Sequence, residues 1–235
     1  MADVFGKALQ DYHQGKYTED ITTYSSLDEK DSIPLPYLFR DYDQMPILER
    51  KALALAKGRV LDIGCCAGVH SLYLQKKGMD VTGLDSSAGV ITVCKERGLK
   101  STVNSSIEDF KGDSFDTLLL LMNGIGLAGT LDNLSSFLQH LASLLRPNGQ
   151  ILLDSSDIIY MFDQDEDGGY WIPDSGKYYG EVTFTLEYKK QKSIPFEWLY
   201  LDFNTLFNAC LSNGLVCELV SSGEHYDYLA RLTKK

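Results

Sequence analysis

The sequence predicts a doubly wound α/β fold with one mostly parallel sheet of seven strands and an antiparallel edge. Apolar runs of strand length alternate with helix-like stretches across residues 58–154, a pattern typical of a parallel sheet covered by helices on both faces. The run Thr117–Leu121 is apolar at every position after the first, as expected for a strand buried on both faces. Right-handed crossovers then place a ligand crevice at the C-terminal ends of the strands.

The predicted elements follow one another regularly along the chain. Strands of the core are predicted at Val60–Ile63, Asp80–Leu84, Ser101–Asn104, Phe115–Met122 and Ile151–Asp154. Helices are predicted between them at Val69–Lys77, Gly89–Arg97 and Leu131–Leu145. A final helix and the two strands of the antiparallel edge are predicted at Phe203–Asn213, Leu215–Val220 and Tyr226–Leu232.

Two further segments frame the core 58–154, and the whole chain is treated as a single domain. Residues 1–57 are expected to form a helical cap. Residues 155–202 are rich in aromatic side chains, and apolar residues alternate with polar ones at Val182–Tyr188, which is typical of a half-buried strand. We therefore expect an aromatic antiparallel insertion over the crevice, followed by the C-terminal helix and edge hairpin of residues 203–235.

A glycine-containing turn links the first core strand to its helix. The turn holds Gly64 and Gly68, and glycine lets a backbone approach a ligand closely. The next strand ends in Asp85, and an acid at that position can accept hydrogen bonds from both hydroxyls of a ribose. Together these residues predict a nucleoside-ligand site. The dinucleotide pattern G-x-G-x-x-G is not matched, because Cys66 and Val69 stand where glycines are expected.

The turn resembles the first motif of the class I S-adenosylmethionine-dependent methyltransferases. Asp62 matches the acid of that motif, and Gly64 and Gly68 match its first and last glycines. Asp62 either braces the glycine loop or reaches the cofactor ammonium through water. Cys66 departs from the usual middle glycine. Asp85 matches the acid that binds the ribose of the cofactor in this family, with the N-cap of the following helix as the alternative role.

The resemblance continues through residues 58–154. Phe115–Leu121 is similar to the fourth strand of the family, and Leu144–Gln150 is similar to the turn before its fifth strand. Cys65 and Ser86 adjoin matched positions and are assigned to the cofactor site with them. The resemblance implies a Rossmann-like fold, S-adenosylmethionine as cofactor and S-adenosylhomocysteine as product.

The resemblance also implies which residues hold the two ends of the cofactor. Ser106 and the Ile107 amide match the adenine-binding pair, and Glu108 takes that role if the alignment shifts by two residues. Tyr37 and Arg40 could reach the cofactor carboxylate if the cap folds down, since arginine suits bidentate carboxylate binding. A surface ion pair is the alternative for Arg40.

Three residues are candidates for contact with the reacting groups. Met122 and Asn123 lie at the tip of the fourth strand, where the family places cofactor and substrate contacts. Asn123 could orient a nucleophile, with an ordinary turn as the alternative. His70 opens the helix after the glycine turn and could act as a base, with a packing histidine as the alternative. No fixed catalytic triad is expected, because in-line displacement mainly requires alignment and exclusion of water.

The function implied is methyl transfer from S-adenosylmethionine by in-line displacement. A small-molecule acceptor is favoured, because the insertion offers apolar lining rather than a basic track. Transfer to a protein or an RNA, and non-catalytic binding of the cofactor, remain open alternatives. The missing glycines disfavour a nicotinamide-dependent oxidoreductase.

The charge and the residue composition argue against several classes of binding partner. The net charge of −11 argues against broad binding to nucleic acid or to an anionic membrane. The five cysteines form no Cys-x-x-Cys pair, and residues 1–10 lack the apolar core of a signal peptide; a cytoplasmic protein is therefore expected. No metal is expected, since no His and Cys spacing is typical of zinc. Residues 163–174 begin like a calcium loop, but Pro173 interrupts it and Asp174 replaces the usual glutamate, so a solvated acidic turn is expected.

Overall fold

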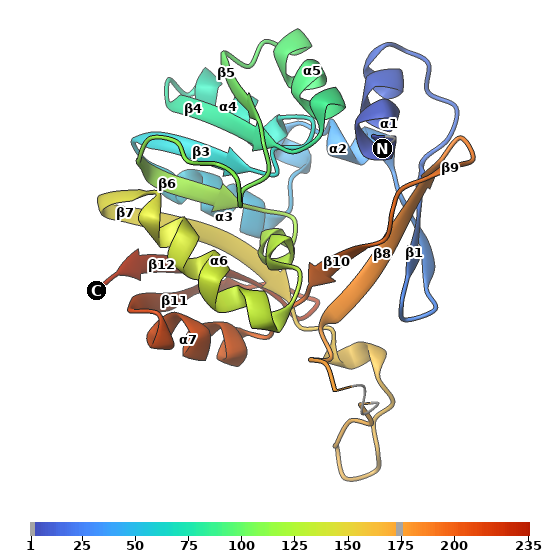
Figure 1. The fold of residues 1–235 in the computed structure, drawn as a ribbon, viewed down its shortest axis with the longest axis vertical. Helices are drawn as coiled ribbons and strands as arrows, with labels where there is room; N and C mark the ends of the chain where they lie inside the picture. Colours follow the sequence, from blue (N-terminus) through green and yellow to red (C-terminus); the bar gives the residue numbers. More distant parts are fainter. Residues whose placement is uncertain (1–2, 173–175) are drawn as a thin grey trace.

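The computed structural model describes residues 3–172 and 176–235. It contains two separate β-sheets (Figure 1). The larger sheet lies between helices, and the smaller sheet is formed by strands from the N-terminal segment and from the insertion.

The large sheet has the strand order β11-β12-β7-β6-β3-β4-β5. Its strands are β3 (Arg59–Ile63), β4 (Asp80–Asp85), β5 (Ser101–Asn104), β6 (Phe115–Leu120), β7 (Leu145–Ser156), β11 (Leu215–Ser222) and β12 (Asp227–Lys234). The pairs among β7, β6, β3, β4 and β5 are parallel, whereas β12 is antiparallel to both β7 and β11. The predicted mostly parallel seven-stranded sheet with an antiparallel edge is confirmed.

Helices pack on both faces of this sheet (Figure 1). They are α3 (Ile47–Leu55), α4 (Val69–Lys76), α5 (Ala88–Glu96), α6 (Leu131–Ser143) and α7 (Phe203–Ser212). Along β6, Leu118 and Leu120 belong to the core formed with α6 and α7, while Leu119, and Leu121 just after the strand, belong to the core formed with α3 and α4. Burial on both faces explains why this strand has no polar alternation.

The small sheet is antiparallel, with the order β10-β8-β1-β2 and with β9 paired to β8. Its strands are β1 (Ile21–Ser25), β2 (Lys30–Ile33), β8 (Glu181–Tyr188), β9 (Gln191–Lys192) and β10 (Phe196–Leu199). The antiparallel insertion is as expected. The N-terminal cap contains the helices α1 (Val4–His13), α2 (Leu35–Leu38) and α3, and also the two strands β1 and β2, which were not predicted. β1 is held by pairing with β8, far along the chain, and no local pattern signals such a partner.

Among the parallel strands, the bounds of β6 and β7 differ from the prediction by two residues or more. β6 ends at Leu120 rather than at Met122, because Met122 and Asn123 adopt left-handed φ values of 67° and 57°. β7 begins at Leu145 rather than at Ile151, so the preceding helix ends earlier than predicted.

The acidic segment after residue 162 forms a turn. The Asp165 carboxylate accepts hydrogen bonds from the amides of Asp167 at 3.1 Å and Gly169 at 2.7 Å. One carboxylate oxygen of Asp165 thus binds both backbone donors within the turn. Pro173 and Asp174, on which the comparison with a calcium loop partly rested, lie outside the described residues.

Candidate functional site

The backbone at the end of β3 depends on two glycines. Gly64 and Gly68 adopt φ values of 71° and 77°, which glycine enters without steric cost, and Gly68 is the N-cap of α4. The amides of Gly64 and Cys65 both donate to the Leu84 carbonyl, at 2.9 and 3.0 Å, and tie the loop to β4. Cys66, the residue that departs from the glycine pattern, has a φ of 50°. A non-glycine residue pays about 1–2 kcal/mol for that conformation.

Asp85 ends β4 between the glycine loop and α5. Its carboxylate accepts hydrogen bonds from the amides of Cys66 at 3.3 Å and Ser87 at 2.9 Å. The N-cap of α5 is Ser87, whose hydroxyl accepts from the Val90 amide at 3.0 Å, so Asp85 is free of that role. Burial raises the pKa of Asp85 to about 6. A partly desolvated carboxylate of this kind gains from hydroxyl donors that a ligand brings. The adjacent Ser86 is exposed.

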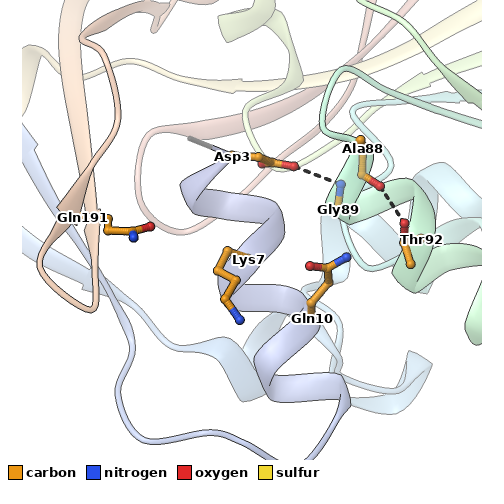
Figure 2. Close-up of a pocket in the computed structure, with 7 residues that line it drawn as sticks. All are labelled: Asp3, Lys7, Gln10, Ala88, Gly89, Thr92 and Gln191. Atoms are coloured by element: carbon orange, nitrogen blue, oxygen red, sulfur yellow. Dashed lines mark hydrogen bonds between the residues drawn. The ribbon is translucent and has the colours of Figure 1, made fainter. Parts of the chain in front are cut away.

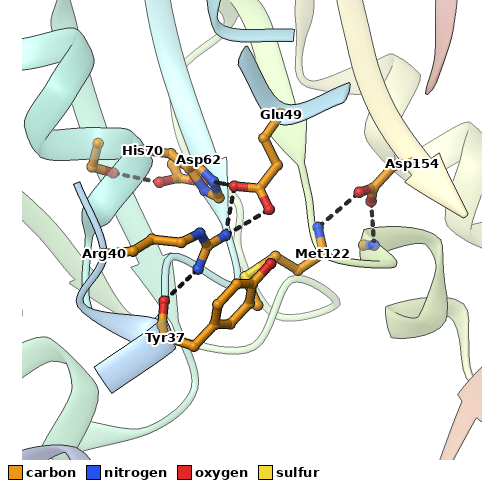
Figure 3. Close-up of polar contacts among 9 residues, drawn as sticks. Tyr37, Arg40, Glu49, Asp62, His70, Met122 and Asp154 are labelled. Carbon is orange, nitrogen blue, oxygen red and sulfur yellow. Dashed lines mark hydrogen bonds and ion pairs between the residues drawn. The ribbon is translucent and has the colours of Figure 1, made fainter. Parts of the chain in front are cut away.

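Asp62 is buried within β3. Its carboxylate accepts a hydrogen bond from the Ser71 hydroxyl of α4 at 2.6 Å (Figure 3). Burial raises the pKa of Asp62. The bond joins the strand to the helix on either side of the glycine loop, which fits the role of a brace.

A buried ionic network joins the cap to the start of α4 (Figure 3). One guanidinium nitrogen of Arg40 lies 2.6 and 2.5 Å from the two Glu49 oxygens, and His70 Nε2 donates to Glu49 at 2.8 Å. Arg40 also donates to the Tyr37 carbonyl at 2.7 Å and lies 4.0 Å from the centre of the Tyr37 ring. Burial by itself would raise the pKa of Glu49, but the hydrogen bonds from His70 and Arg40 outweigh it and leave the pKa below its usual value. Arg40 therefore belongs to a buried pair rather than to the surface pair considered from the sequence.

Glu49 was missed by the sequence analysis. It is 3% exposed and stands next to Leu48 on α3. A carboxylate beside the buried face of an amphipathic helix is a usable signal, because such a group is buried only when it is paired. The two partners, Arg40 and His70, could not be identified from spacing.

Asp154, near the C-terminal end of β7, holds the turn after β6 in which Met122 and Asn123 have left-handed φ values. The Asp154 carboxylate accepts hydrogen bonds from the amides of Met122 and Gly124, both at 3.1 Å (Figure 3). Burial raises the pKa of Asp154 to about 6. From the sequence, Asp154 is predicted only as the end of a strand, and nothing in its spacing assigns it to the site.

Asn123 is held at both ends of its amide. Its Nδ2 donates to the Leu199 carbonyl at 3.1 Å, and its Oδ1 accepts from the Ser156 amide at 3.3 Å. The side chain thus connects the turn after β6 to β7 and to the end of β10. The expectation that Asn123 orients a nucleophile stays a prediction, and these backbone partners favour a structural role.

A cavity of about 180 Å³ lies at the C-terminal ends of β6 and β7. Its lining residues are Tyr37, Pro46, Leu48, Glu49, Met122, Asn123, Asp154, Ser155, Ser156 and Asp227. We call it the β6–β7 cavity. It adjoins the Arg40–Glu49 network, and Figure 3 shows the Tyr37 ring on the same side as Met122, with Asp154 beyond.

The predicted adenine-binding pair follows β5. The Ser106 hydroxyl lies 3.1 Å from an Asp109 carboxylate oxygen and accepts from the Asp109 amide at 3.2 Å. Ile107 is buried, and its carbonyl accepts from His140 Nε2 at 2.8 Å. Glu108, the alternative candidate, is exposed.

A second, open hollow of about 370 Å³ lies where α1 meets α5 and β9 (Figure 2). Asp3 at its edge accepts hydrogen bonds from the Ser87 hydroxyl at 2.7 Å and the Gly89 amide at 2.9 Å. A Cβ on Gly89 would lie 2.7 Å from the backbone of Gly6, so the two helices approach as closely as their glycines allow. The hollow therefore marks a helix-docking contact beside Asp85.

The structure brings most predicted site residues to the C-terminal ends of the strands of the large sheet. The ends of β3, β4 and β6, with the adjoining cap, carry Asp62, Gly64, Cys65, Gly68, His70, Asp85, Ser86, Met122, Tyr37 and Arg40. Ser106 and Ile107 follow β5, at the outer end of the same row of strand ends.

Within residues 3–172 and 176–235, no group of three or more His, Cys, Asp or Glu side chains is arranged to hold a metal ion. In the same part of the chain, no helix is long and apolar enough to cross a membrane.

Comparisons with known proteins point in one direction. Residues 61–153 match the family model of a methyltransferase domain. A crystal structure of a SAM-dependent methyltransferase from Bacteroides fragilis in complex with S-adenosyl-L-homocysteine is 43% identical, with a TM-score of 0.91, and the match covers 99% of this chain and 94% of that one.

Two other similarities cover less of the chain or show less identity. A ubiquinone biosynthesis O-methyltransferase from Xanthomonas euvesicatoria is 30% identical over 111 residues, which cover 44% of this chain and 45% of that protein. The chain spans about half the length of the curated relatives it matches. The methyltransferase CcbJ from Streptomyces caelestis is 16% identical with a TM-score of 0.62, over 82% of this chain and 94% of that one, and is similar in fold alone.

Proposed function

The chain belongs to the S-adenosylmethionine-dependent methyltransferases, and on that premise we propose that it transfers a methyl group from S-adenosylmethionine to a small-molecule acceptor. The observation that carries the proposal is the meeting of the glycine loop with Asp85 at the ends of β3 and β4, in a chain 43% identical to a methyltransferase crystallised with S-adenosyl-L-homocysteine. The β6–β7 cavity beside that loop supplies a space for the acceptor.

The residues present fit the cofactor of this family. A Cβ on Gly64 would meet only the Leu127 side chain, at 3.6 Å, so the loop backbone is open to a ligand. Arg40 Nε is buried and has no hydrogen-bond partner among the described residues, which leaves one donor for a ligand carboxylate. The open loop backbone at Gly64 and the Arg40 donor suit the ammonium and the carboxylate of the amino-acid part of the cofactor.

The roles proposed follow from these positions. Asp85 accepts the two ribose hydroxyls, with Ser86 beside it. The backbone of Gly64 and Cys65 meets the methionine part, and Arg40 with Tyr37 lies near its carboxylate. Gly68 and Asp62 hold the loop in shape, through the left-handed cap of α4 and the bond to Ser71.

The adenine and the methyl group lie, in this proposal, at opposite ends of the same site. Ser106 and the Ile107 amide meet the adenine after β5. Met122 packs near the sulfur at the end of β6. Asn123 and His70 act indirectly, because both side chains are already bonded within the protein.

The cofactor supplies a methyl group already activated by a positive sulfur. The protein therefore has to align the acceptor and exclude water, and it needs a proton acceptor only when the nucleophile must lose a proton. The cap contributes to this exclusion of water, since Tyr37, Leu48 and Glu49 line the β6–β7 cavity.

Calorimetry with S-adenosylhomocysteine tests the proposal. Wild-type protein should bind it at micromolar concentration, and Asp85→Ala should weaken binding by about tenfold or more, on the scale of hydrogen bonds to a charged group. Asp132→Ala, an exposed acid of α6, is the matched control and should leave the affinity unchanged. Folded wild-type protein that fails to bind would refute the proposal, and an unchanged affinity in Asp85→Ala would refute the ribose role.

Turnover on cell extract separated into small-molecule and macromolecular fractions tests the acceptor class. Methyl incorporation should occur in the small-molecule fraction. Incorporation confined to protein or RNA would contradict the proposal, and binding without incorporation in either fraction would indicate a non-catalytic module.

A further inference from the structure

The lining of the β6–β7 cavity carries charge of one sign. Three of its residues, Glu49, Asp154 and Asp227, are acids, and none is Lys, Arg or His. The Glu49 carboxylate is already compensated by Arg40 and His70. The charge that remains at the cavity is therefore that of Asp154 and Asp227.

Neither remaining carboxylate has a cationic partner among the described residues. Asp154 accepts only from the amides of Met122 and Gly124, and Asp227 accepts from the amide of His225 at 3.0 Å. The pKa of Asp154, raised to about 6 by burial, still lies below neutral pH, so the group is mainly ionised there. A half-buried anion without a counter-charge is unfavourable, and a cation that enters the cavity would offset this cost.

The rest of the lining is apolar or neutral. Tyr37, Pro46, Leu48 and Met122 supply apolar surface, and Met122 adjoins the backbone turn that Asp154 holds in place. A ligand that matches this cavity therefore carries a positive group on a small apolar body.

We infer that the methyl acceptor is a small amine that enters the β6–β7 cavity as an ammonium ion, with Asp154 as its counter-charge and proton acceptor. The inference rests on the proposed function, because it takes the cavity to be the acceptor site of a methyltransferase. It goes beyond that function by assigning the acceptor class and a catalytic residue.

The proton and electron balance of the reaction is complete with these groups. The ammonium ion gives one proton to the Asp154 carboxylate and becomes a neutral amine. The nitrogen lone pair then forms the new N–C bond as the methyl–sulfur bond breaks, and the electron pair of that bond stays on sulfur. Asp154 returns its proton to solvent, so that no oxidant, reductant or metal is needed.

Other acceptor classes fit this lining less well. A phenolate or a carboxylate would place a second anion beside Asp154, with no cation in the lining to stabilise it. A neutral alcohol would gain a hydrogen bond but would leave the carboxylate charge uncompensated. The charge on the acceptor is thus the property that the cavity should discriminate most strongly.

Three probes of matched shape test the inference: benzylamine, benzyl alcohol and benzoate, which are cationic, neutral and anionic at pH 7. Each is titrated by calorimetry into protein saturated with S-adenosylhomocysteine. Benzylamine should bind at least about tenfold more tightly than benzyl alcohol, which corresponds to one charge-assisted contact. Benzoate should show no saturable binding. Equal affinities, a reversed order, or no binding of benzylamine would overturn the inference.

Two variants locate the preference. Asp154→Asn should reduce the preference for benzylamine over benzyl alcohol to less than about threefold, and Asp132→Asn on the exposed surface of α6 should retain the wild-type ratio. A full preference in Asp154→Asn would overturn the assigned counter-charge. If that variant does not fold, the wild-type probe series with Asp227→Asn decides, because loss of one of two carboxylates should lower the preference partially.

Failure of the proposed function would be visible first. If the protein does not bind S-adenosylhomocysteine, the proposed function fails before any probe is added. A protein that binds it but shows no preference for the cationic probe keeps the proposed function and loses only the amine assignment.

Discussion

The site has two halves: the C-terminal ends of β3 and β4, with the glycine loop and Asp85, and the C-terminal ends of β6 and β7, with the β6–β7 cavity. The two halves are built in different ways. At the ends of β3 and β4, the shape comes from the backbone: Gly64 and Gly68 adopt positive φ, and amides from the loop bind the Leu84 carbonyl and the Asp85 carboxylate. At the ends of β6 and β7, the shape comes from side chains that originate in the cap, in β7 and in β12. A ligand common to a whole family can be held by backbone geometry, whereas an acceptor must be recognised by side chains that can vary.

Strain is also distributed differently between the halves. The glycine loop contains one non-glycine residue with positive φ, Cys66, while the turn after β6 contains two in succession, Met122 and Asn123. Each costs about 1–2 kcal/mol, and such a conformation persists only where its surroundings fix it. The Asp154 carboxylate and the two bonds of the Asn123 amide are those surroundings.

Glu49 connects the two halves, and removing it should have the largest effect on stability. It binds His70 beside the glycine loop, binds Arg40 in the cap and lines the β6–β7 cavity. Glu49→Ala should lower the free energy of unfolding by about 3–5 kcal/mol, because it leaves the Arg40 charge buried without a partner. Urea unfolding at pH 7 measures this difference.

The matched variants for Glu49 separate a broken pair from lost packing. Glu108→Ala, at an exposed position, should change stability by less than about 0.5 kcal/mol. The double variant Arg40→Met/Glu49→Leu should recover most of the loss, since it removes both charges together. A double variant no more stable than Glu49→Ala would show that the buried pair is not the cause.

The contrast between the halves also explains what the sequence could predict. The glycine loop and Asp85 were found because a positive φ and a strand-end acid restrict residue type at fixed spacing. The seven-stranded sheet was predictable because strands buried on both faces, such as β6, contain an uninterrupted apolar run, here Leu118–Leu120. Glu49 and Asp154 were not assigned, because their partners come from distant segments and only tertiary packing brings them together.

The two half-buried acids, Asp85 and Asp154, should make stability fall as pH rises. Burial raises the pKa of each to about 6 in the folded state, above the unfolded value near 3.8. The folded state therefore holds more protons between pH 4 and 6, and each group loses at most about 3 kcal/mol of stabilisation as pH rises through that window. Urea unfolding of wild type and Asp154→Asn from pH 4 to 7 measures the share of Asp154 by difference.

Saturating S-adenosylhomocysteine should act on only one of these two acids. Hydroxyl donors bound to Asp85 would lower its pKa and remove its share of the slope, while the share of Asp154 should persist. The reverse pattern, or identical profiles for wild type and Asp154→Asn without ligand, would contradict the assignment of the two acids to different halves.

Gly68→Ala should test the half of the site at the ends of β3 and β4, because it adds a single Cβ atom to the glycine loop. Gly68 has φ of 77°, and its new Cβ would lie 3.1 Å from Cys94 Sγ. The matched control is Gly78→Ala, with φ of 87° and nothing within 4 Å. Both should lose about 1–2 kcal/mol from the backbone conformation. Gly68→Ala alone should also weaken S-adenosylhomocysteine binding in calorimetry, and equal affinities in the two variants would show that the loop tolerates displacement.

The smallest effect on stability is expected at Asp3, which joins α1 to the start of α5 (Figure 2). Its carboxylate caps α1 by accepting from the Gly6 amide at 2.9 Å, and its other oxygen accepts from Ser87 and Gly89 at the start of α5. Asp3→Ala should lower stability by about 1 kcal/mol, the usual cost of a lost helix cap. Hydrogen exchange should quicken in α1, because the polar link between its first turn and the start of α5 is lost. The preference for benzylamine should stay at its wild-type value, since Asp3 does not line the β6–β7 cavity. Unchanged exchange in α1 would mean that packing of the Gly6 and Gly89 backbones, rather than the shared cap, holds the helix in place.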